Sequence, residues 1–289
     1  MGPCICRDDG SFAVTTVSNT DALKNITGTI VLAGAGKMGG AMLTGWLAGG
    51  LDAGRVIVVE PSPSGEIKAL AARGVRLNPN EPAAAETLVM AVKPQTFREA
   101  GPMVRPFVGA STLVVSIMAG TKISALEQVC GGMVVRAMPN TPAAIGRGIT
   151  VAVAAAKVSA AQRATADALL RAIGSVEWVE DEGLMDAVTA VSGSGPAYVF
   201  LLAEELARAG VEAGLPLGLA TKLARETVAG SGELLHRSDL PAATLRQNVT
   251  SPGGTTAAAL EVLMSKDGLQ QLMIRAIAAA TKRSIELAK

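Results

Sequence analysis

A glycine-rich stretch early in the chain contains residues that could hold a phosphate group. Residues 34–39 read GAGKMG, fit the spacing G-x-G-x-x-G, and stand between an apolar run and a stretch with helical spacing. In such a motif the first glycine permits a tight turn, the second lets a pyrophosphate approach the backbone, and the third lets helix and strand pack closely. The helix start adds unpaired N–H groups. In this context the motif predicts a dinucleotide-binding loop.

The turn after the next apolar run bears on which dinucleotide binds. Glu60 ends that run and is followed by PSPS at 61–64. A carboxylate at this point usually accepts the ribose 2′-hydroxyl and repels a 2′-phosphate, which favours NADH. Ser62 and Ser64 could instead donate to a 2′-phosphate, and the Glu60 side chain could be turned to solvent. The turn contains no arginine, so the residues leave NADH and NADPH both open.

Few residues are available to assist a hydride transfer, which is the natural task of such a loop when a second domain closes over the nicotinamide. The one histidine, His236, stands near a predicted helix end, where a cap or surface role is more common, and this disfavours lactate-type chemistry. Lys222 is the candidate for the helix lysine of a 3-hydroxy-acid dehydrogenase, but it has no amide partner four residues on. A cyclic iminium is already electrophilic and protonated, so its reduction needs orientation more than a strong acid.

A second polar loop has residues that could orient such a substrate. Residues 248–256 read NVTSPGGTT and precede an alanine-rich helical stretch. The glycines expose backbone N–H groups, the hydroxyls add donors, and a helix N-terminus favours an anion. Ser and Thr are also ordinary N-cap residues, so a capped helix start is the alternative. One asparagine, four hydroxyls and two adjacent glycines exceed what a cap needs, and we expect a carboxylate-binding site.

The elements that must position these loops follow from the apolar pattern. Apolar, β-rich runs alternate with helical stretches until about Glu180, which indicates parallel βαβ units with strands buried on both faces. We expect strands at 29–33, 55–59, 87–92, 112–117, 133–138 and 149–154, with helices at 38–47, 67–73, 94–104 and 122–129. Only helical stretches follow, at 184–191, 197–209, 217–235, 255–264 and 269–288. The expected fold is α/β: a poorly ordered N-terminal extension over 1–28, a Rossmann-type dinucleotide-binding domain over 29–181, and an all-helical domain over 182–289.

The composition excludes several classes of protein. With 26 Lys+Arg against 25 Asp+Glu and 2% aromatic residues, the chain offers neither the basic field nor the stacking platform of a nucleic-acid-binding protein. The longest uncharged run, 187–203, is broken by glycine and proline and is shorter than the roughly 20 residues of a membrane span. The three cysteines have no nearby histidine, so we expect no metal site. Asp8 and Asp9 stand where a signal peptide needs its apolar stretch, and we expect a cytoplasmic protein.

From about residue 30 to the C-terminus the chain resembles pyrroline-5-carboxylate reductase, the last enzyme of proline biosynthesis. The resemblance rests on GAGKMGGAM at 34–42, AVKP at 91–94, RAMPNTPA at 136–143, SGSGPAYVF at 192–200 and NVTSPGGTT at 248–256, the last being the family's signature region. It implies reduction of 1-pyrroline-5-carboxylate to L-proline by hydride transfer from NADPH or NADH. It also implies that the second domain is a dimerisation domain, which forms a homodimer or higher homo-oligomer by interleaving helices, so that one subunit completes its neighbour's site.

The resemblance further implies roles for individual residues. Thr256 matches the threonine near the ring nitrogen of the substrate and is the expected catalytic residue. Further substrate contacts fall on Asn248, Ser251, Gly254, Thr255, Glu182 and Asp239. Cofactor contacts fall on Gly34, Gly36, Lys37, Met38, Gly39, Glu60, Ser62, Asn80, Ala91, Val92, Lys93, Pro94, Met118, Ala119 and Gly120. Family members commonly prefer NADPH, and Glu60 departs from that preference.

Two other functions are alternatives to this reductase. A 3-hydroxy-acid dehydrogenase would use the same dinucleotide loop but lacks its Lys–Asn helix pair here. A non-catalytic dinucleotide-sensing protein would have to keep the polar loop at 248–256 without using it.

Overall fold

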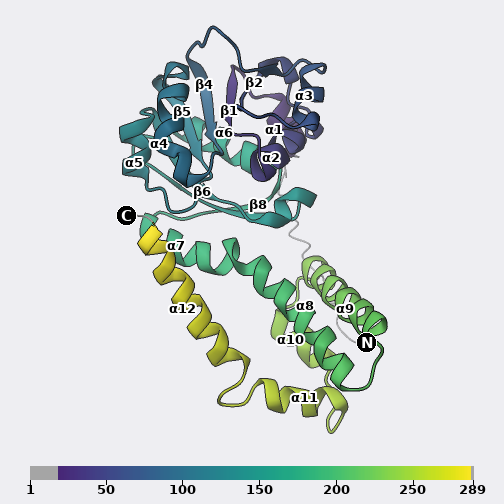
Figure 1. Cartoon of the computed structure of the whole chain (residues 1–289). Helices are drawn as coiled ribbons and strands as arrows, with labels where there is room; N and C mark the ends of the chain where they lie inside the picture. Colours follow the sequence, from purple (N-terminus) through teal and green to yellow (C-terminus); the bar gives the residue numbers. More distant parts are fainter. Residues whose placement is uncertain (1–18, 288–289) are drawn as a thin grey trace, which may run out of the picture.

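The computed structural model describes residues 19–287, and residues 19–181, here called the Rossmann half, are built on one eight-stranded sheet (Figure 1). The strand order is β3-β2-β1-β4-β5-β6-β7-β8, and neighbours are parallel except β6 and β7, which pair antiparallel. The order reverses between β1 and β4, the point at which open α/β sheets bind ligands. The strands are β1 Ile30–Ala33, β2 Val56–Val59, β3 Arg76–Leu77, β4 Ala85–Met90, β5 Val108–Ser116, β6 Met133–Met138, β7 Gly148–Ala154 and β8 Gly174–Trp178.

Helices cover both faces of this sheet, which explains its continuous apolar strands. Side chains alternate between the faces along a strand, so Val31 and Leu32 of β1 enter two different apolar cores. Trp46 of α2 is buried in one core and donates its indole N–H to the Leu169 carbonyl of α6 over 2.8 Å. Phe97 of α4 lies in the other. The helices of this half are α1 Asn19–Lys24, α2 Lys37–Ala48, α3 Gly65–Ala71, α4 Phe97–Val104, α5 Ile123–Val129 and α6 Ala160–Arg171.

The expectation of a poorly ordered extension over 1–28 is wrong for residues 19–28. Residues 19–24 form α1, which contacts α6, and the Leu23 side chain is 1% exposed. Leu23 and Ile26 belong to the same core as Trp46. A helix of six residues is too short to reveal itself by periodicity, and its order depends on the surface that it covers. Residues 1–18, the rest of that expected extension, lie outside the described residues.

Besides α1, two strands and one helix of the Rossmann half were not expected from the sequence. β3 has two residues, and β8 buries Val176 alone, so neither edge strand presents an apolar run. Helix α6 starts at a capping box in which Ser159 and Gln162 bond each other's backbone N–H groups. The six strands that we expected are all present, within a few residues of their predicted bounds.

Residues 182–287, here called the helical half, form an extended arrangement of helices below the sheet in Figure 1. A 3₁₀ turn at Glu182–Leu184 leads into α7 Met185–Val188 and a π-helical turn Thr189–Gly193, followed by α8 Gly195–Glu212, α9 Leu217–Arg237, α10 Ala242–Asn248, α11 Thr255–Leu263 and α12 Leu269–Leu287. The last begins where we expected it, and the expected Ala288 lies beyond the described residues. Helix α10 was not expected. Within residues 19–287 no helix combines the length and the apolar character that crossing a membrane requires.

The helical half has almost no core within a single chain. Across α8 to α12 the buried residues are Ala207, Ala220, Ala224 and Ser284. Large apolar side chains are instead exposed, among them Phe200 at 68%. Helices α8 and α9 contact each other, and Gly210 of α8 lies close to Ala220 of α9. An amphipathic helix is stable when its apolar face is buried, so this half needs a further surface to cover it.

Candidate functional site

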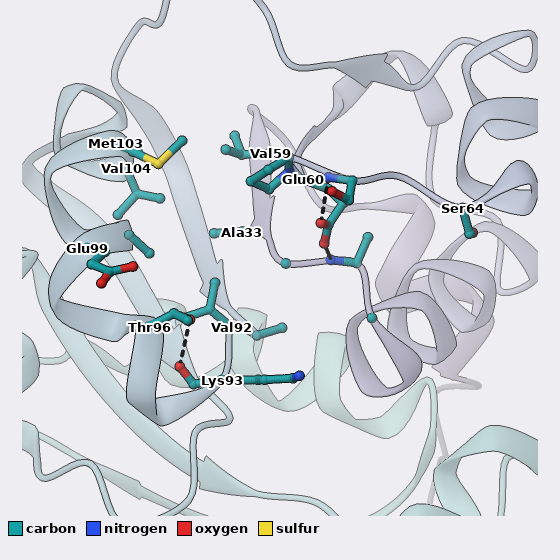
Figure 2. Close-up of a pocket in the computed structure, with 17 residues that line it drawn as sticks. Ala33, Val59, Glu60, Ser64, Val92, Lys93, Thr96, Glu99, Met103 and Val104 are labelled. Carbon is teal, nitrogen blue, oxygen red and sulfur yellow. Dashed lines mark hydrogen bonds between the residues drawn. The ribbon is translucent and has the colours of Figure 1, made fainter.

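A cavity of about 530 Å³ lies at the carboxyl ends of β1, β2 and β4, where the sheet order reverses (Figure 2). The glycine loop after β1 forms one wall, the turn after β2 forms another, and the segment from β4 into α4 closes the third. Its lining residues include Gly34, Ala35, Gly36, Glu60, Ser62, Ser64, Ala91, Val92, Lys93, Thr96, Glu99 and Met103. The cavity therefore lies where the sequence predicts a dinucleotide.

The glycine loop has the backbone geometry that its three glycines were expected to permit. Gly34 has φ +89°, and a Cβ there would meet the Ala91 carbonyl at 2.7 Å. A Cβ on Gly39 would collide with the Gly34 carbonyl, whereas a Cβ on Gly36 would meet nothing within 4 Å. Gly36 thus leaves open space beside the backbone, just before α2 begins at Lys37. A dinucleotide pyrophosphate fits this space and the N–H groups at the helix start.

Glu60 is folded onto the glycine loop and is not turned to solvent. Its Oε2 accepts the Ala35 N–H at 2.8 Å, and its Oε1 accepts the Ser62 N–H at 3.1 Å (Figure 2). Asn78 holds the Glu60 backbone from both sides: its amide oxygen accepts the Glu60 N–H, and its amide nitrogen donates to the Glu60 carbonyl, each at 2.9 Å. A negative charge is therefore fixed at the mouth of the cavity.

Asn78 is a residue that the sequence reasoning missed. It follows the short strand β3 and has φ +46°, a left-handed conformation that asparagine adopts more readily than most residues. Asn80, which we expected to contact the cofactor, is not among the residues that line the cavity. Asparagine tolerates a positive φ, but the strand before Asn78 presents no apolar run, so the sequence offered only a weak signal for this turn.

The expected cofactor residues around β4 and the start of α2 lie at the cavity or beside it. Lys93 lines it, its carbonyl accepts the Thr96 hydroxyl at 3.0 Å, and its side chain extends away from α4 (Figure 2). Pro94 begins the 3₁₀ turn before α4. Lys37 faces a neighbouring cavity between α2 and α3. Met38 packs partly buried against the core, and Ala91 and Val92 complete the β4 edge of the cavity.

Residues Met118, Ala119 and Gly120 follow β5 and stand outside the lining of that cavity. Met118 is buried and donates its N–H to the Ser116 hydroxyl at 3.3 Å. Gly120 has φ +70°, so the chain turns sharply here before α5 begins at Ile123. The segment therefore lies at the carboxyl end of β5, two strands along from β1.

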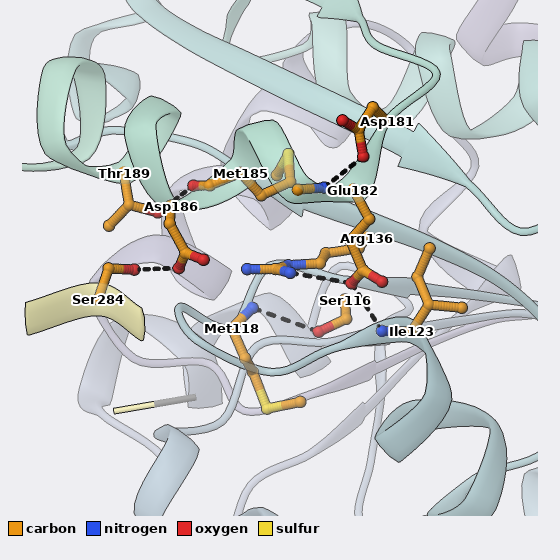
Figure 3. Close-up of polar contacts among 11 residues, drawn as sticks. Ser116, Met118, Ile123, Arg136, Asp181, Glu182, Met185, Asp186, Thr189 and Ser284 are labelled. Carbon is orange, nitrogen blue, oxygen red and sulfur yellow. Dashed lines mark hydrogen bonds and ion pairs between the residues drawn. The ribbon is translucent and has the colours of Figure 1, made fainter. Parts of the chain in front are cut away.

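Glu182 lies at a polar junction between the two halves (Figure 3). Its Oε1 accepts the Ile123 N–H at 2.8 Å and a guanidinium N–H of Arg136 at 2.9 Å. Arg136, on β6, is 3% exposed. One turn along the chain, Asp186 accepts the Ser284 hydroxyl of α12 at 2.6 Å. The sequence reasoning did not assign Arg136 a role, although a charged residue inside an apolar strand was a signal that it has a buried partner.

The polar loop at 248–256 begins at the end of α10 and leads into α11. Gly254 is the N-cap residue of α11, and no side chain in the described part of the chain caps that helix. The Thr250 hydroxyl instead donates backward to the Arg246 carbonyl at 2.7 Å. Ser251 and Thr255 are exposed, and Thr256 is partly exposed. The alternative of a simple capped helix start is therefore not what the structure shows, and the first turn of α11 has free N–H groups for an anion.

The dinucleotide cavity and the polar loop do not meet within one chain. Figure 1 shows α11 at the end of the helical half farthest from the sheet, while α7 meets the sheet. Asn248 is the last residue of α10 and directly precedes the polar loop, whereas Asp239 lies exposed between α9 and α10. Apart from Glu182, the expected substrate-side residues therefore fall between Asp239 and Thr256 in the helical half, remote from the cofactor side.

The described residues offer no place for a metal ion and no reactive thiol. Within residues 19–287 no cluster of three or more His, Cys, Asp or Glu side chains could hold a metal. Cys130 is buried, and burial raises the pKa of its thiol to about 11. A thiol with that pKa is almost wholly protonated at neutral pH and is a poor nucleophile. Cys4 and Cys6 lie outside the described residues.

Two family models match the chain, one on each half. Residues 182–287 match the model described as pyrroline-5-carboxylate reductase dimerisation. Residues 29–120 match the model described as NADP oxidoreductase coenzyme F420-dependent. The boundary of the first match falls on Glu182, at the junction between the halves.

Curated relatives resemble the chain over nearly its whole length. The pyrroline-5-carboxylate reductase of Pseudomonas aeruginosa is 39% identical over 268 residues, which cover 91% of this chain and 98% of that protein. The pyrroline-5-carboxylate reductase of Synechocystis is 45% identical over 224 residues, covering 74% of this chain and 81% of that protein.

Solved structures agree with these relatives. A pyrroline-5-carboxylate reductase from Coxiella burnetii is 34% identical, with a TM-score of 0.84, and the match covers 91% of this chain and 100% of that one. A pyrroline carboxylate reductase from Plasmodium falciparum, solved with NADP bound, is 29% identical with a TM-score of 0.74, covering 92% of this chain and 99% of that one.

Proposed function

Because this chain belongs to the pyrroline-5-carboxylate reductase family, we propose that its glycine loop and its polar loop hold the cofactor and the substrate of one reduction. The reaction is the NAD(P)H-dependent reduction of 1-pyrroline-5-carboxylate to L-proline. One observation carries the assignment of the substrate side: no side chain in residues 19–287 accepts a hydrogen bond from the N–H groups at the start of α11, and none of the nearby hydroxyls caps that helix. The proposal accordingly gives them an external carboxylate to bind.

The cofactor side of the proposal uses the cavity at the edge of the sheet. NAD(P)H, when bound, supplies the hydride. The space beside Gly36 and the N–H groups at the start of α2 suit its pyrophosphate, and the carboxylate of Glu60 stands where the adenosine ribose is expected. Ala91, Val92 and Lys93 line the same cavity at the end of β4. We extend the site to Met118, Ala119 and Gly120 on the nicotinamide side.

On the substrate side, the chain has to orient a ring whose C=N bond is already electrophilic. The hydroxyls of Ser251 and Thr255 and the backbone at Gly254 are placed to hold the carboxylate at the start of α11. Thr256, one residue into the helix, is assigned to the ring nitrogen. Asn248 and Asp239 flank the loop and complete the proposed substrate contacts. Holding the ring in one orientation is the main task, because no strong acid is needed to activate an iminium.

Both sides belong to one site only in an assembly of at least two chains. The exposed apolar faces of α8 to α12 provide the surface for such an assembly, and the family match on this half is to a dimerisation domain. We infer a homodimer or higher homo-oligomer in which the polar loop of one chain faces the dinucleotide cavity of its partner.

We place the reaction in the cytoplasm, since Cys130 is a free thiol of the kind found in reducing compartments.

The experiment that tests the function follows the oxidation of NADH and NADPH with 1-pyrroline-5-carboxylate near neutral pH. Thr256→Ala is expected to lower kcat about 100-fold while dinucleotide binding persists, because one transition-state hydrogen bond is removed. Thr165→Ala, which removes an exposed hydroxyl of α6 far from either loop, is the matched control and should keep wild-type turnover. Folded protein that binds dinucleotide yet shows no turnover would contradict the assignment.

A further inference from the structure

The polar junction between the halves contains a charge pair whose arginine is buried. Arg136 is 3% exposed in the middle of the sheet, and its side chain pairs with that of Glu182, which is 30% exposed. A buried arginine is costly unless it is paired, so an apolar residue in β6 would have been the simpler choice for stability alone. The pair therefore calls for a role other than stabilising the core.

Glu182 links three elements through one oxygen atom. Its Oε1 accepts from Arg136 of β6 and from the N–H of Ile123, the first residue of α5. Lys122, the N-cap residue of α5, gives that helix no side-chain cap, so Glu182 supplies the acceptor from 59 residues away. A carboxylate at a helix start is favourable both as a hydrogen-bond acceptor and against the helix dipole.

The elements that meet here lead toward the nicotinamide side and the substrate side of the proposed site. Helix α5 follows directly on Met118–Gly120, the segment assigned to the nicotinamide side. On the other side, Asp186 of α7 is bonded to Ser284 of α12, the long helix that runs toward α11. Figure 3 shows the Arg136 guanidinium lying between the carboxylates of Glu182 and Asp186. These side chains therefore meet at the place where the Rossmann half joins the helical half.

We propose that Glu182 and Arg136 are positioning residues, which fix the helical half on the Rossmann half and thereby align substrate with nicotinamide, and that Glu182 does not itself contact the substrate. This inference rests on the proposed function, because the angle between the halves of one chain decides where its polar loop lies against the partner's cavity. A misplacement of about 1 Å can cost on the order of 100-fold in rate, so a small change of angle is enough to be measured.

The test is a double-mutant cycle on kcat and KM with Glu182→Gln, Arg136→Met and the double variant. Glu182→Gln is expected to lower kcat at least tenfold with KM for 1-pyrroline-5-carboxylate within about twofold, since the substrate loop is untouched. The double variant should be no slower than the slower single variant, because the two residues act as one unit. Glu180→Gln is the matched control. Glu180 lies two residues before Glu182 and forms an exposed ion pair with Arg163, so losing it should leave kcat and KM unchanged.

Three outcomes would overturn the inference: an unchanged kcat in Glu182→Gln, a rise in KM for the substrate that accounts for the whole effect, or losses that multiply in the double variant. If Glu182→Gln does not fold, Arg136→Lys, which keeps the buried charge and alters its geometry, is expected to show the same fall in kcat at constant KM. An inactive wild-type protein would overturn the proposed function instead. The junction is then tested by thermal unfolding, in which the double variant must melt above Glu182→Gln because it no longer buries an unpaired charge.

Discussion

At the scale of the residue, the side chain with the clearest consequence is Glu60. Both of its carboxylate oxygens are bonded to backbone N–H groups, one in the glycine loop and one in the turn that holds Ser62. Asn78 holds its backbone in place, and the carboxylate cannot swing away without breaking both of its own hydrogen bonds. A 2′-phosphate placed at this turn would meet a fixed negative charge, whereas a ribose 2′-hydroxyl would meet an acceptor.

This arrangement predicts a preference for NADH that Glu60 maintains. Glu60→Ser is expected to raise kcat/KM for NADPH relative to NADH by about tenfold or more, because it removes the repelling charge and adds a donor. The measurement is the ratio of the two specificity constants at fixed substrate. Glu81→Ser, which removes a carboxylate from the exposed loop after Asn78, is the control and should leave the ratio unchanged. A Glu60→Ser ratio equal to that of the wild type would show that Glu60 does not select the cofactor.

At the scale of the element, the glycine loop contains one glycine that the packing of the fold requires and one that the cofactor requires. A side chain at Gly39 has no room because the Gly34 carbonyl occupies the position of its Cβ, so helix α2 could not pack on β1. A side chain at Gly36 has open space and an extended backbone with φ −68°, which any residue can adopt. Gly39 therefore serves the fold, and Gly36 serves the cofactor.

Two alanine variants are expected to behave differently for this reason. Gly39→Ala should lower the free energy of unfolding by roughly 1–3 kcal/mol, since it forces overpacking between helix and strand. Gly36→Ala should leave the melting temperature nearly unchanged but raise KM for the dinucleotide at least tenfold, because the methyl group enters the space for the pyrophosphate. Thermal unfolding without cofactor and KM measurements on each folded variant distinguish the two effects. Equal losses of stability in both variants would contradict this division of roles.

At the scale of the whole molecule, the helical half has a surface where a core would be expected. Its long helices bury mostly alanine, while Phe200, Leu201 and Leu202 of α8 are all more than half exposed. These three lie on one helix that also borders a cavity of about 870 Å³ between α8 and α9. Large apolar side chains exposed in this number along α8 to α12 indicate a protein partner, and a second copy of the chain is the partner that the family implies.

The molecule is therefore expected to lose assembly and activity together when this face is made polar. Phe200→Asp should convert the oligomer to a monomer in size-exclusion chromatography with light scattering and reduce turnover at least tenfold, although neither loop is changed. Ala164→Asp, on the exposed face of α6 in the Rossmann half, should alter neither property. The wild-type melting temperature should also rise with protein concentration, as it does when folding and association are linked. A fully active monomer would contradict the shared site.

The local features of this protein were determined by its sequence. The glycine loop, the polar loop at 248–256 and the alternation of apolar runs with helical stretches depend on backbone permissiveness, hydroxyl chemistry and side-chain period, and each is a property of neighbouring residues. Only the tertiary structure decided the long-range contacts: α1 on the core, the Glu60 carboxylate on Ala35, and Glu182 on Arg136 and Ile123. Those contacts join residues 25 to 59 positions apart in the two Glu examples, and no local pattern encodes such a pairing. The distance between the two loops within one chain was likewise decided by the arrangement of α8 to α12. The apolar faces of these helices are left for another surface to cover.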